Sequence, residues 1–495
     1  MPSTRAVSRS AAIRGRLGHP VIDADGHFLE LSALFAEDVD SLVREIGGRE
    51  VHDRFRRGRI LPWDVAPPGA ERDPRDSWRA AAPWWGWPTG NTVDRATVHL
   101  PRLLYERLGE LGIDFAVLYP SHGLSYSHAL AYRHALDPEL AQVVSRAINT
   151  IYAETFRSYS DRMVPVASIP MHTPAAAVEE LDYAVERLRY KAVRIGGYAV
   201  RPIPRVDRDH PELFPFANRF DTFGIDSEHD YDPFWARCVE LRVAPVTHSS
   251  LLNRPTRSVS SYVYNHIGGL AEAHAALLKS LFLGGVVRRF PRLRVGFLEG
   301  GVAWACALLA DLVGHWEKRN VEALLENLDP ARIDVDRLID LVRRYGEESV
   351  RNRLEAIRES FRRPIPRPAE LDEWAACGIE ASQDIATAFA RSFYFGCEGD
   401  DRTVAWAFRS DVNPFGAKLA AMFGSDIGHW DVPDMASSLA EAYELVEKGI
   451  LGEADFREFT FVNAARLHAG ANPDFFEGTA CQAAVAALQA SGEVT

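Results

Sequence analysis

The chain has 495 residues, of which 47% are hydrophobic and 25% charged, and its formal net charge is −13. This composition is ordinary for a globular protein with a large core, and the length suits one very large domain or two to four ordinary ones. The negative charge disfavours non-specific binding to nucleic acid or to an anionic membrane. The five cysteines form no CxxC pair, which argues for a reducing compartment and against a disulfide framework or a thiolate zinc site.

Residues 1–18 contain four arginines but no apolar stretch of the kind found in secretory signals. We expect a flexible N-terminal tail there, with a transit peptide as the alternative. No apolar run reaches the roughly 18 residues that a membrane span needs. The sequence therefore predicts a cytoplasmic protein without a membrane segment.

Eight short apolar runs predict strands, and helical periodicity or turn signals follow each of them. The predicted strands are Val21–Asp25, Asp114–Tyr119, Met163–Ile169, Ala192–Gly196, Val243–His248, Leu293–Glu299, Ser392–Cys397 and Ala421–Asp426. The helices predicted between and after them are Asp137–Tyr159, Pro174–Tyr190, Pro233–Leu241, Gly269–Arg289, Val302–Lys318, Pro433–Lys448 and Glu453–His468. A strand followed by a helix, repeated eight times, predicts an α/β fold in which residues 19–470 form one (β/α)8 TIM barrel.

A minimal TIM barrel needs about 250 residues, so two large insertions must decorate this one, after strands 1 and 6. The first insertion, about residues 33–103, contains Trp63, Trp78, Trp84, Trp85 and Trp87. It is predicted to form either a lid over an apolar substrate or a small satellite core or subunit contact. The second, about residues 327–390, predicts charged helices over Val335–Tyr345 and Glu348–Phe361. Residues 471–495 predict a peripheral C-terminal tail.

Side chains that commonly bind metals stand at the ends of four predicted strands. Asp25 and His27 are two residues apart, so they project the same way and offer a two-point metal chelate, although a turn cap would explain this pair alone. His248, Glu299 and Asp426 end the fifth, sixth and eighth strands. Because the C-terminal ends of barrel strands converge on one face, the five residues together predict a metal site.

Other polar residues near these strand ends are weaker candidates. Glu30 is placed either to bridge two metal ions or to orient His27. Arg194, at the end of the fourth strand, is predicted to hold a substrate carboxylate or phosphate or, equally, to form a structural salt bridge. His266 is expected near the barrel mouth as a catalytic residue or metal ligand, and His274 is expected to pack a helix. Supporting or undecided roles remain for Glu398, Asp400, His122, His128 and His429.

The segments that carry these residues resemble the amidohydrolase-related family of metal-dependent TIM barrels, which includes aminocarboxymuconate-semialdehyde decarboxylase. The resembling segments are Asp23–Glu30, Val246–Ser249, Leu283–Trp304 and Gly424–Asp434. The resemblance runs through the barrel but not through the insertions. It implies that Asp25, His27, His248 and Asp426 hold the metal, which in that family is usually zinc.

One position departs from that family, because Glu299 stands where its hydrolases and decarboxylases carry a histidine that serves as acid and base. Counting Glu30, the site would contain four carboxylates and two imidazoles, which is the usual composition of a di-iron centre. This pattern is similar to the non-haem di-iron monooxygenases of actinobacterial diterpenoid biosynthesis. That similarity implies two iron ions, O2 activation, hydroxylation of a bulky, CoA-linked acid and a separate electron donor.

The oxygenase is the leading expectation, and two alternatives remain. The first is a mononuclear zinc or manganese hydrolase or non-oxidative decarboxylase, with Glu299 or His266 as the base. The second is a barrel without enzymatic activity that keeps a relic metal site. A small molecule is the expected partner in both enzymatic cases. The oligomeric state stays open, although barrels of this family are commonly homodimers.

Overall fold

The computed structural model describes residues 7–60, 90–133, 135–214, 216–248, 257–364 and 367–494. The five tryptophans of the first insertion, and therefore the lid predicted from them, lie outside these residues. No helix in the described part of the chain is both long and apolar enough to cross a membrane.

The eight predicted strands form one parallel sheet in the order β1-β2-β3-β4-β7-β8-β9-β10. The last strand returns to the first, where the backbone N–H of Asp426 donates to the carbonyl oxygen of Asp25 at 2.9 Å. The predicted TIM barrel is confirmed. The strands are β1 (Ile22–Phe28), β2 (Phe115–Pro120), β3 (Met163–Ser168), β4 (Ala192–Ile195), β7 (Pro245–Thr247), β8 (Val295–Phe297), β9 (Phe393–Glu398) and β10 (Ala420–Gly424).

Alternating side chains along each strand divide the core in two. In β2, Val117 and Tyr119 belong to one buried cluster, whereas Ala116 and Leu118 belong to another. Successive side chains of a strand point to opposite faces, so the first cluster fills the barrel interior and the second packs against the outer helices. An antiparallel pair, β5 (Ala199–Pro202) and β6 (Asn218–Asp221), was not predicted.

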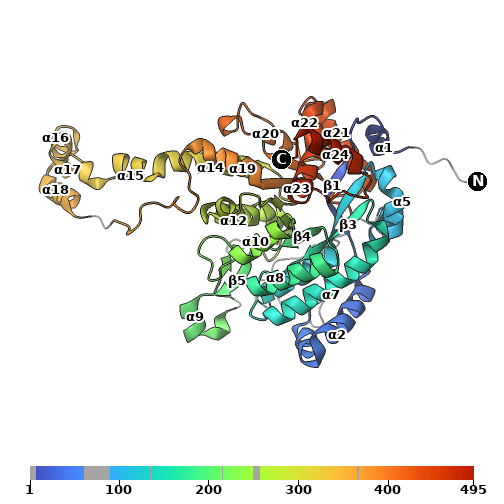
Figure 1. Ribbon diagram of the computed structural model, residues 1–495. Helices are drawn as coiled ribbons and strands as arrows, with labels where there is room; N and C mark the ends of the chain where they lie inside the picture. Colours follow the sequence, from blue (N-terminus) through green and yellow to red (C-terminus); the bar gives the residue numbers. More distant parts are fainter. Residues whose placement is uncertain are drawn as a thin grey trace, which may run out of the picture.

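Helices surround the strands (Figure 1). They are α1 (Arg9–Arg14), α2 (Ser32–Gly58), α4 (Thr92–His99), α5 (Pro101–Leu111), α6 (Ser121–Arg133), α7 (Pro138–Phe156), α8 (Pro174–Asp182), α9 (Pro204–Asp209), α10 (Asp232–Glu240), α11 (Tyr262–His266), α12 (Gly269–Leu283), α13 (Val286–Arg289), α14 (Ala303–Arg319), α19 (Ser382–Ser392), α20 (Val404–Ala407), α21 (Ser438–Glu447), α22 (Glu453–Arg457), α23 (Asn463–Ala471) and α24 (Gln482–Ser491).

The helix predicted over Gly269–Arg289 is broken into α12 and α13. Gly285 has a φ of 72°, and a Cβ atom there would lie 2.2 Å from the carbonyl oxygen of Ala376. The break therefore needs glycine both for its left-handed backbone and for the close approach of another segment.

The second insertion forms a projecting arm (Figure 1). Its helices are α15 (Val321–Asn327), α16 (Val335–Tyr345), α17 (Glu348–Arg351) and α18 (Leu354–Arg362), so the predicted helix Val335–Tyr345 is confirmed with the same bounds. The predicted insertion also took in α19, which the structure packs against α14 in the barrel wall.

Both ends of the chain are more ordered than the sequence suggested. Residues 9–14 form α1, which packs against α21 and buries Ile13. Near the other end, Phe475 and Phe476 join the interior cluster, with the Phe476 ring 5.2 Å from that of Phe115. The C-terminal segment therefore closes the amino-terminal end of the barrel and is not peripheral, because the apolar interior needs a cover there.

Candidate metal centre

A bulge in β1 brings two ligand-type residues into the barrel mouth. The pairing of β1 with β2 shifts register between Asp23 and Gly26. A bulge lets two successive residues reach the same side of a strand, and here Ala24 joins the interior cluster while Asp25 faces the mouth. At Gly26 a Cβ atom would lie 2.6 Å from Oδ2 of Asp23, so only glycine fits the bulge.

Four side chains from β1 and from the segments after β7 and β10 converge at this mouth, each at most 6% exposed. His27 Nε2 lies 3.2 Å from His248 Nε2, 3.6 Å from Asp25 Oδ1 and 3.1 Å from Asp426 Oδ1. His248 Nε2 lies 3.7 Å from Asp25 Oδ1. Ligands placed about 2.1 Å from a tetrahedral zinc ion are about 3.4 Å apart, so each of these pair spacings suits a shared divalent cation. Asp25, His27 and His248 form one group able to hold an ion, and Asp426 belongs to a second group that shares His27 with the first.

The chemistry of the four side chains fits such an ion. Oδ1 of Asp25 and Oδ1 of Asp426 are buried and accept no hydrogen bond from the residues that the structure describes. A buried carboxylate oxygen without a donor is costly, and a cation between the two oxygens would remove that cost.

Glu299 and His429 form a charged pair beside these ligands. Glu299 Oε2 lies 3.0 Å from His248 Nε2, and Glu299 Oε1 lies 3.7 Å from His429 Nδ1. Although burial opposes ionisation, His248 and His429 together hold the pKa of Glu299 well below its usual value. Burial likewise opposes the charged form of His429, but Asp426 and Glu299 outweigh it and raise the pKa of that ring well above its usual value.

Burial opposes the charged forms of three further members of the cluster. Burial, reinforced by Glu299, raises the pKa of Asp25 and of Asp426 well above the usual range. Burial also holds the pKa of His27 well below its ordinary value.

The backbone at two of these residues is strained. Glu299 and Asp426 have φ angles of 55° and 46°. Residues other than glycine rarely adopt this left-handed conformation, which costs of order 1–3 kcal/mol and tends to cluster at functional sites. His274 supports the turn at Glu299, since its Nε2 lies 2.6 Å from the carbonyl oxygen of Leu298.

Three members of these groups were not predicted as metal ligands from the sequence. His27, Glu299, Asp426 and His429 form one group able to hold a cation, and Glu398, Asp426 and Asp431 form another. His429 had been left undecided, Glu398 had been expected to cap or support, and Asp431 was not considered. The available signal was the spacing of Asp426, His429 and Asp431 in one loop after a strand, which turns three side chains toward the same mouth.

The structure does not bring Glu30 into this cluster. Its Oε2 accepts a hydrogen bond from the backbone N–H of His122 at 2.9 Å, and its Oε1 accepts one from that of Gly123 at 3.0 Å. Both donors belong to the first turn of α6, whose unpaired N–H groups attract a carboxylate. With both oxygens engaged, Glu30 holds α6 against β1.

His266 also lies outside the groups able to bind a cation. Its ring is 5.1 Å from that of Tyr262 and 5.7 Å from that of Trp430, so it belongs to an aromatic cluster beside His429. Of the remaining candidates, Asp400 and His128 are exposed, and His122 Nε2 lies 3.0 Å from Ser32 Oγ.

Arg194 lies buried in the same layer of the barrel. Its Nε donates to Ser168 Oγ at 3.0 Å, and burial lowers its pKa to about 10. Within the described parts of the chain, no carboxylate lies within ion-pair distance of this guanidinium. The hydroxyl of Tyr119, whose ring is 5.5 Å from that of His248, is buried and makes no hydrogen bond to any described residue.

Comparisons with known proteins agree with this barrel. Residues 135–361 match the family described as Amidohydrolase. An amidohydrolase from Mycobacterium avium subsp. paratuberculosis is 18% identical, with 91% of this chain and 100% of that one covered and a TM-score of 0.55. The 5-carboxyvanillate decarboxylase of Sphingomonas paucimobilis is 14% identical, with 91% of this chain and 98% of that chain covered and a TM-score of 0.47. The enzyme of the same name from Novosphingobium aromaticivorans, solved with manganese, is 13% identical, with 92% and 97% covered and a TM-score of 0.47.

At these identities the likeness to solved structures concerns the fold. The matched segment runs from just before α7 into α18 and contains His248 and Glu299, but not the ligands of β1 or those after β10. The chain therefore has a TIM-barrel fold, and its residues 135–361 match the amidohydrolase family.

Proposed function

We propose that this chain is a metal-dependent enzyme that hydrolyses or non-oxidatively decarboxylates a small molecule, using one divalent cation held by Asp25, His27, His248 and Asp426. The observation that carries the proposal is the place of His27, whose Nε2 lies 3.1–3.6 Å from one ligand atom of each of the other three residues. A cation bound there supplies a Lewis acid that polarises a substrate oxygen. The amidohydrolase match over residues 135–361 supports the same class of chemistry.

Glu299 and His429 would transfer the protons of this reaction. The lowered pKa of Glu299 favours an ionised carboxylate that accepts a proton at Oε1 or Oε2, whereas the raised pKa of His429 favours a protonated ring that donates one. A base and an acid held on opposite sides of neutral pH can act in sequence without first exchanging protons with solvent. Glu299, which follows β8, thus acts as the base, and His429, three residues after Asp426, acts as the acid.

Arg194 is proposed to bind an anionic group of the substrate. A buried guanidinium without a carboxylate partner is costly, and its planar face pairs with a carboxylate or a phosphate through two hydrogen bonds. Tyr119 lies in the same interior layer and offers an unpaired hydroxyl to the same anion.

A di-iron oxygenase is the second candidate function. The group formed by Glu398, Asp426 and Asp431 shares Asp426 with the first ligand set, so Asp426 could bridge two ions. The placement of Glu30 removes one of the four carboxylates on which the expectation of two iron ions rested.

Metal analysis combined with a single substitution separates the two candidates. Protein purified anaerobically from cells supplied with iron, zinc and manganese should contain close to one zinc or manganese ion per chain. Glu299→Gln should keep that ion and lose turnover on carboxylic acids, esters or amides with or without O2. Close to two irons per chain, lost together in Glu299→Gln, would favour the oxygenase. Protein that binds no metal would refute both.

A further inference from the structure

The barrel has a seam between its first and last strands. Within the described parts of the chain, every neighbouring pair of barrel strands forms a parallel ladder except β1 and β10. A backbone hydrogen bond from the N–H of Asp426 to the carbonyl oxygen of Asp25 joins the two sides beyond β10. Three of the four proposed ligands, Asp25, His27 and Asp426, lie on these two sides. The geometry of the metal centre therefore depends on what holds the seam together.

Asp23, which is fully buried, spans this seam with its carboxyl group. Its Oδ1 accepts hydrogen bonds from the backbone N–H of Ser425 at 2.8 Å and from that of Asp25 at 3.2 Å. Its Oδ2 accepts a hydrogen bond from the hydroxyl of Ser425 at 2.6 Å. One side chain thus binds both the bulge of β1 and the residue that precedes Asp426.

The turn at Asp426 needs such support. Asp426 has a φ of 46°, and a residue other than glycine keeps this strained conformation only where its surroundings enforce it. Ser425 is fixed by its two hydrogen bonds to Asp23, and its Oγ also lies 3.3 Å from the backbone nitrogen of Ile427, from which it accepts a hydrogen bond. The turn is therefore anchored on both sides of Asp426, whose Oδ1 lies 3.1 Å from Nε2 of His27.

Two glycines let the sides of the seam approach closely. A Cβ atom at Gly26 would lie 2.6 Å from Oδ2 of Asp23, and one at Gly424 would lie 2.8 Å from Cβ of Asp25. Among the described residues, Asp23 belongs to none of the groups able to hold a cation. Both of its oxygens accept hydrogen bonds across the seam, so Asp23 acts on the metal centre through the ligands.

We propose that Asp23 is the positioning residue of the metal centre, which holds Asp25 and Asp426 in place for a cation without binding the ion itself. This inference rests on the proposed function for the bound cation, and it adds a residue that sets the affinity for the ion and its coordination geometry. Asp23 supplies acceptor atoms in fixed places, so a neutral side chain of the same shape should replace it. Removal of those acceptors should release the turn at Asp426 and let the ligands move apart.

Cobalt binding to the full-length protein tests the proposal, because the visible absorption of bound cobalt(II) depends on its coordination geometry. Asp23→Ala should weaken cobalt binding by about 10- to 100-fold, the usual effect of losing a residue that orients metal ligands, and should change the spectrum. Asp23→Asn should keep the wild-type spectrum and an affinity within about 3-fold of the wild-type value. Its amide oxygen can accept both backbone N–H groups, while its NH2 group donates to Ser425 Oγ.

A second variant removes one contact of the seam and keeps the others. Ser425→Ala lacks the hydroxyl that donates to Asp23 but retains the backbone N–H, so it disturbs the fold less than Asp23→Ala does. It should weaken cobalt binding by about 10-fold, at the lower end of the range for such residues.

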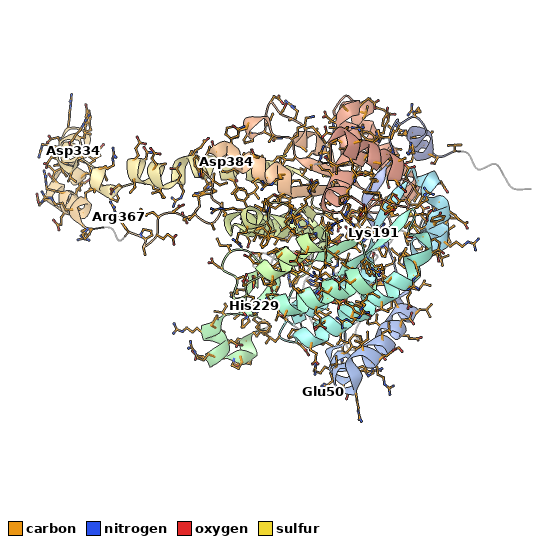
Figure 2. All side chains as sticks on the ribbon, in the orientation of Figure 1. Glu50, Lys191, His229, Asp334, Arg367 and Asp384 are labelled. Carbon is orange, nitrogen blue, oxygen red and sulfur yellow. The ribbon has the colours of Figure 1, made fainter. Side chains whose placement is uncertain are left out.

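Asp221→Ala is the matched control. Asp221 is also buried, and it accepts hydrogen bonds from the backbone N–H of Phe223 at 3.0 Å and from the hydroxyl of Ser227 at 2.9 Å. The same hydroxyl oxygen accepts from the backbone N–H of His229, which Figure 2 labels well below the position of β1 in Figure 1. The control should lower the Tm of the metal-free protein but leave the affinity for cobalt and its spectrum unchanged.

The outcomes separate this proposal from the proposed function. Unchanged affinity and spectrum in both Asp23→Ala and Ser425→Ala, or an Asp23→Asn variant as impaired as Asp23→Ala, would overturn the role of Asp23. If the variants differ as expected but the wild-type protein catalyses neither hydrolysis nor decarboxylation, the proposed function fails and the role of Asp23 is upheld. A wild-type protein that binds no cobalt would refute both.

Discussion

Replacing Asp426 by asparagine should separate metal binding from folding. Burial, reinforced by Glu299, raises the pKa of Asp426, which favours the neutral carboxyl in the metal-free protein. Asparagine has nearly the same shape and no charge. The contact at stake is the one between His429 Nδ1 and Asp426 Oδ2, 2.9 Å apart, so the metal-free variant should lose only about 1 kcal/mol of unfolding free energy.

The metal-bound proteins should differ much more. At a metal concentration 100 times the dissociation constant, the wild-type protein gains about 2.7 kcal/mol of stability. Loss of a charged ligand should weaken binding by 100-fold or more, which leaves the variant about 0.4 kcal/mol at the same concentration. For a chain of 495 residues the wild-type gain is a rise in Tm of roughly 2–3 °C, and that of the variant is less than about 0.5 °C.

Calorimetry of chelator-treated protein, titrated with manganese, zinc or anaerobic ferrous iron, measures both quantities. Asp221→Asn is the matched control, because Asp221 is equally buried but pairs with Arg201 outside the barrel, Nε to Oδ2 at 3.1 Å. The control should lower the metal-free Tm and keep the full metal shift. The reasoning would be refuted by a metal shift in Asp426→Asn equal to that of the wild-type protein, or by a loss of several kcal/mol without metal.

Three further outcomes follow from the same structure. Because burial raises the pKa of Asp25 and of Asp426 without metal, binding one divalent cation should release protons and weaken as the pH falls. Titration calorimetry in buffers of different ionisation enthalpy would count the released protons, and no release would contradict this account. Glu30→Gln should lower stability by about 1–3 kcal/mol, since one backbone N–H of α6 loses its acceptor, while elemental analysis should find the metal retained. Burial raises the pKa of Glu180 from 4.5 to about 7, so the native state binds that proton more tightly and the stability it confers is lost as pH rises through that range. Denaturant unfolding should therefore show that the stability of Glu180→Gln relative to the wild-type protein rises by up to about 3 kcal/mol from pH 5 to pH 8. An equal stability difference between the two proteins at both pH values would contradict this sign.

The sequence by itself determined the barrel and the main ligand positions. Parallel strands buried on both faces are continuous apolar runs, which is why all eight strands were found at about the right places. The ends of such strands must meet on one face, so Asp25, His27, His248 and Asp426 could be grouped without coordinates. Turns and breaks were harder, because the split between α12 and α13 depends on the contact of Gly285 with Ala376.

Only the tertiary structure decided which neighbouring polar residues join the site. Glu30 and His429 each lie three residues from a ligand, yet Glu30 binds the first turn of α6 whereas His429 joins Asp426 and Glu299. Sequence spacing gives the position of a residue along a loop but not the direction of its side chain, which depends on the donors brought near it by other segments. The same limit applies to the arm, whose helix α16 was predicted with its correct bounds. That it projects from the barrel follows from packing between distant parts of the chain, and no local pattern encodes it.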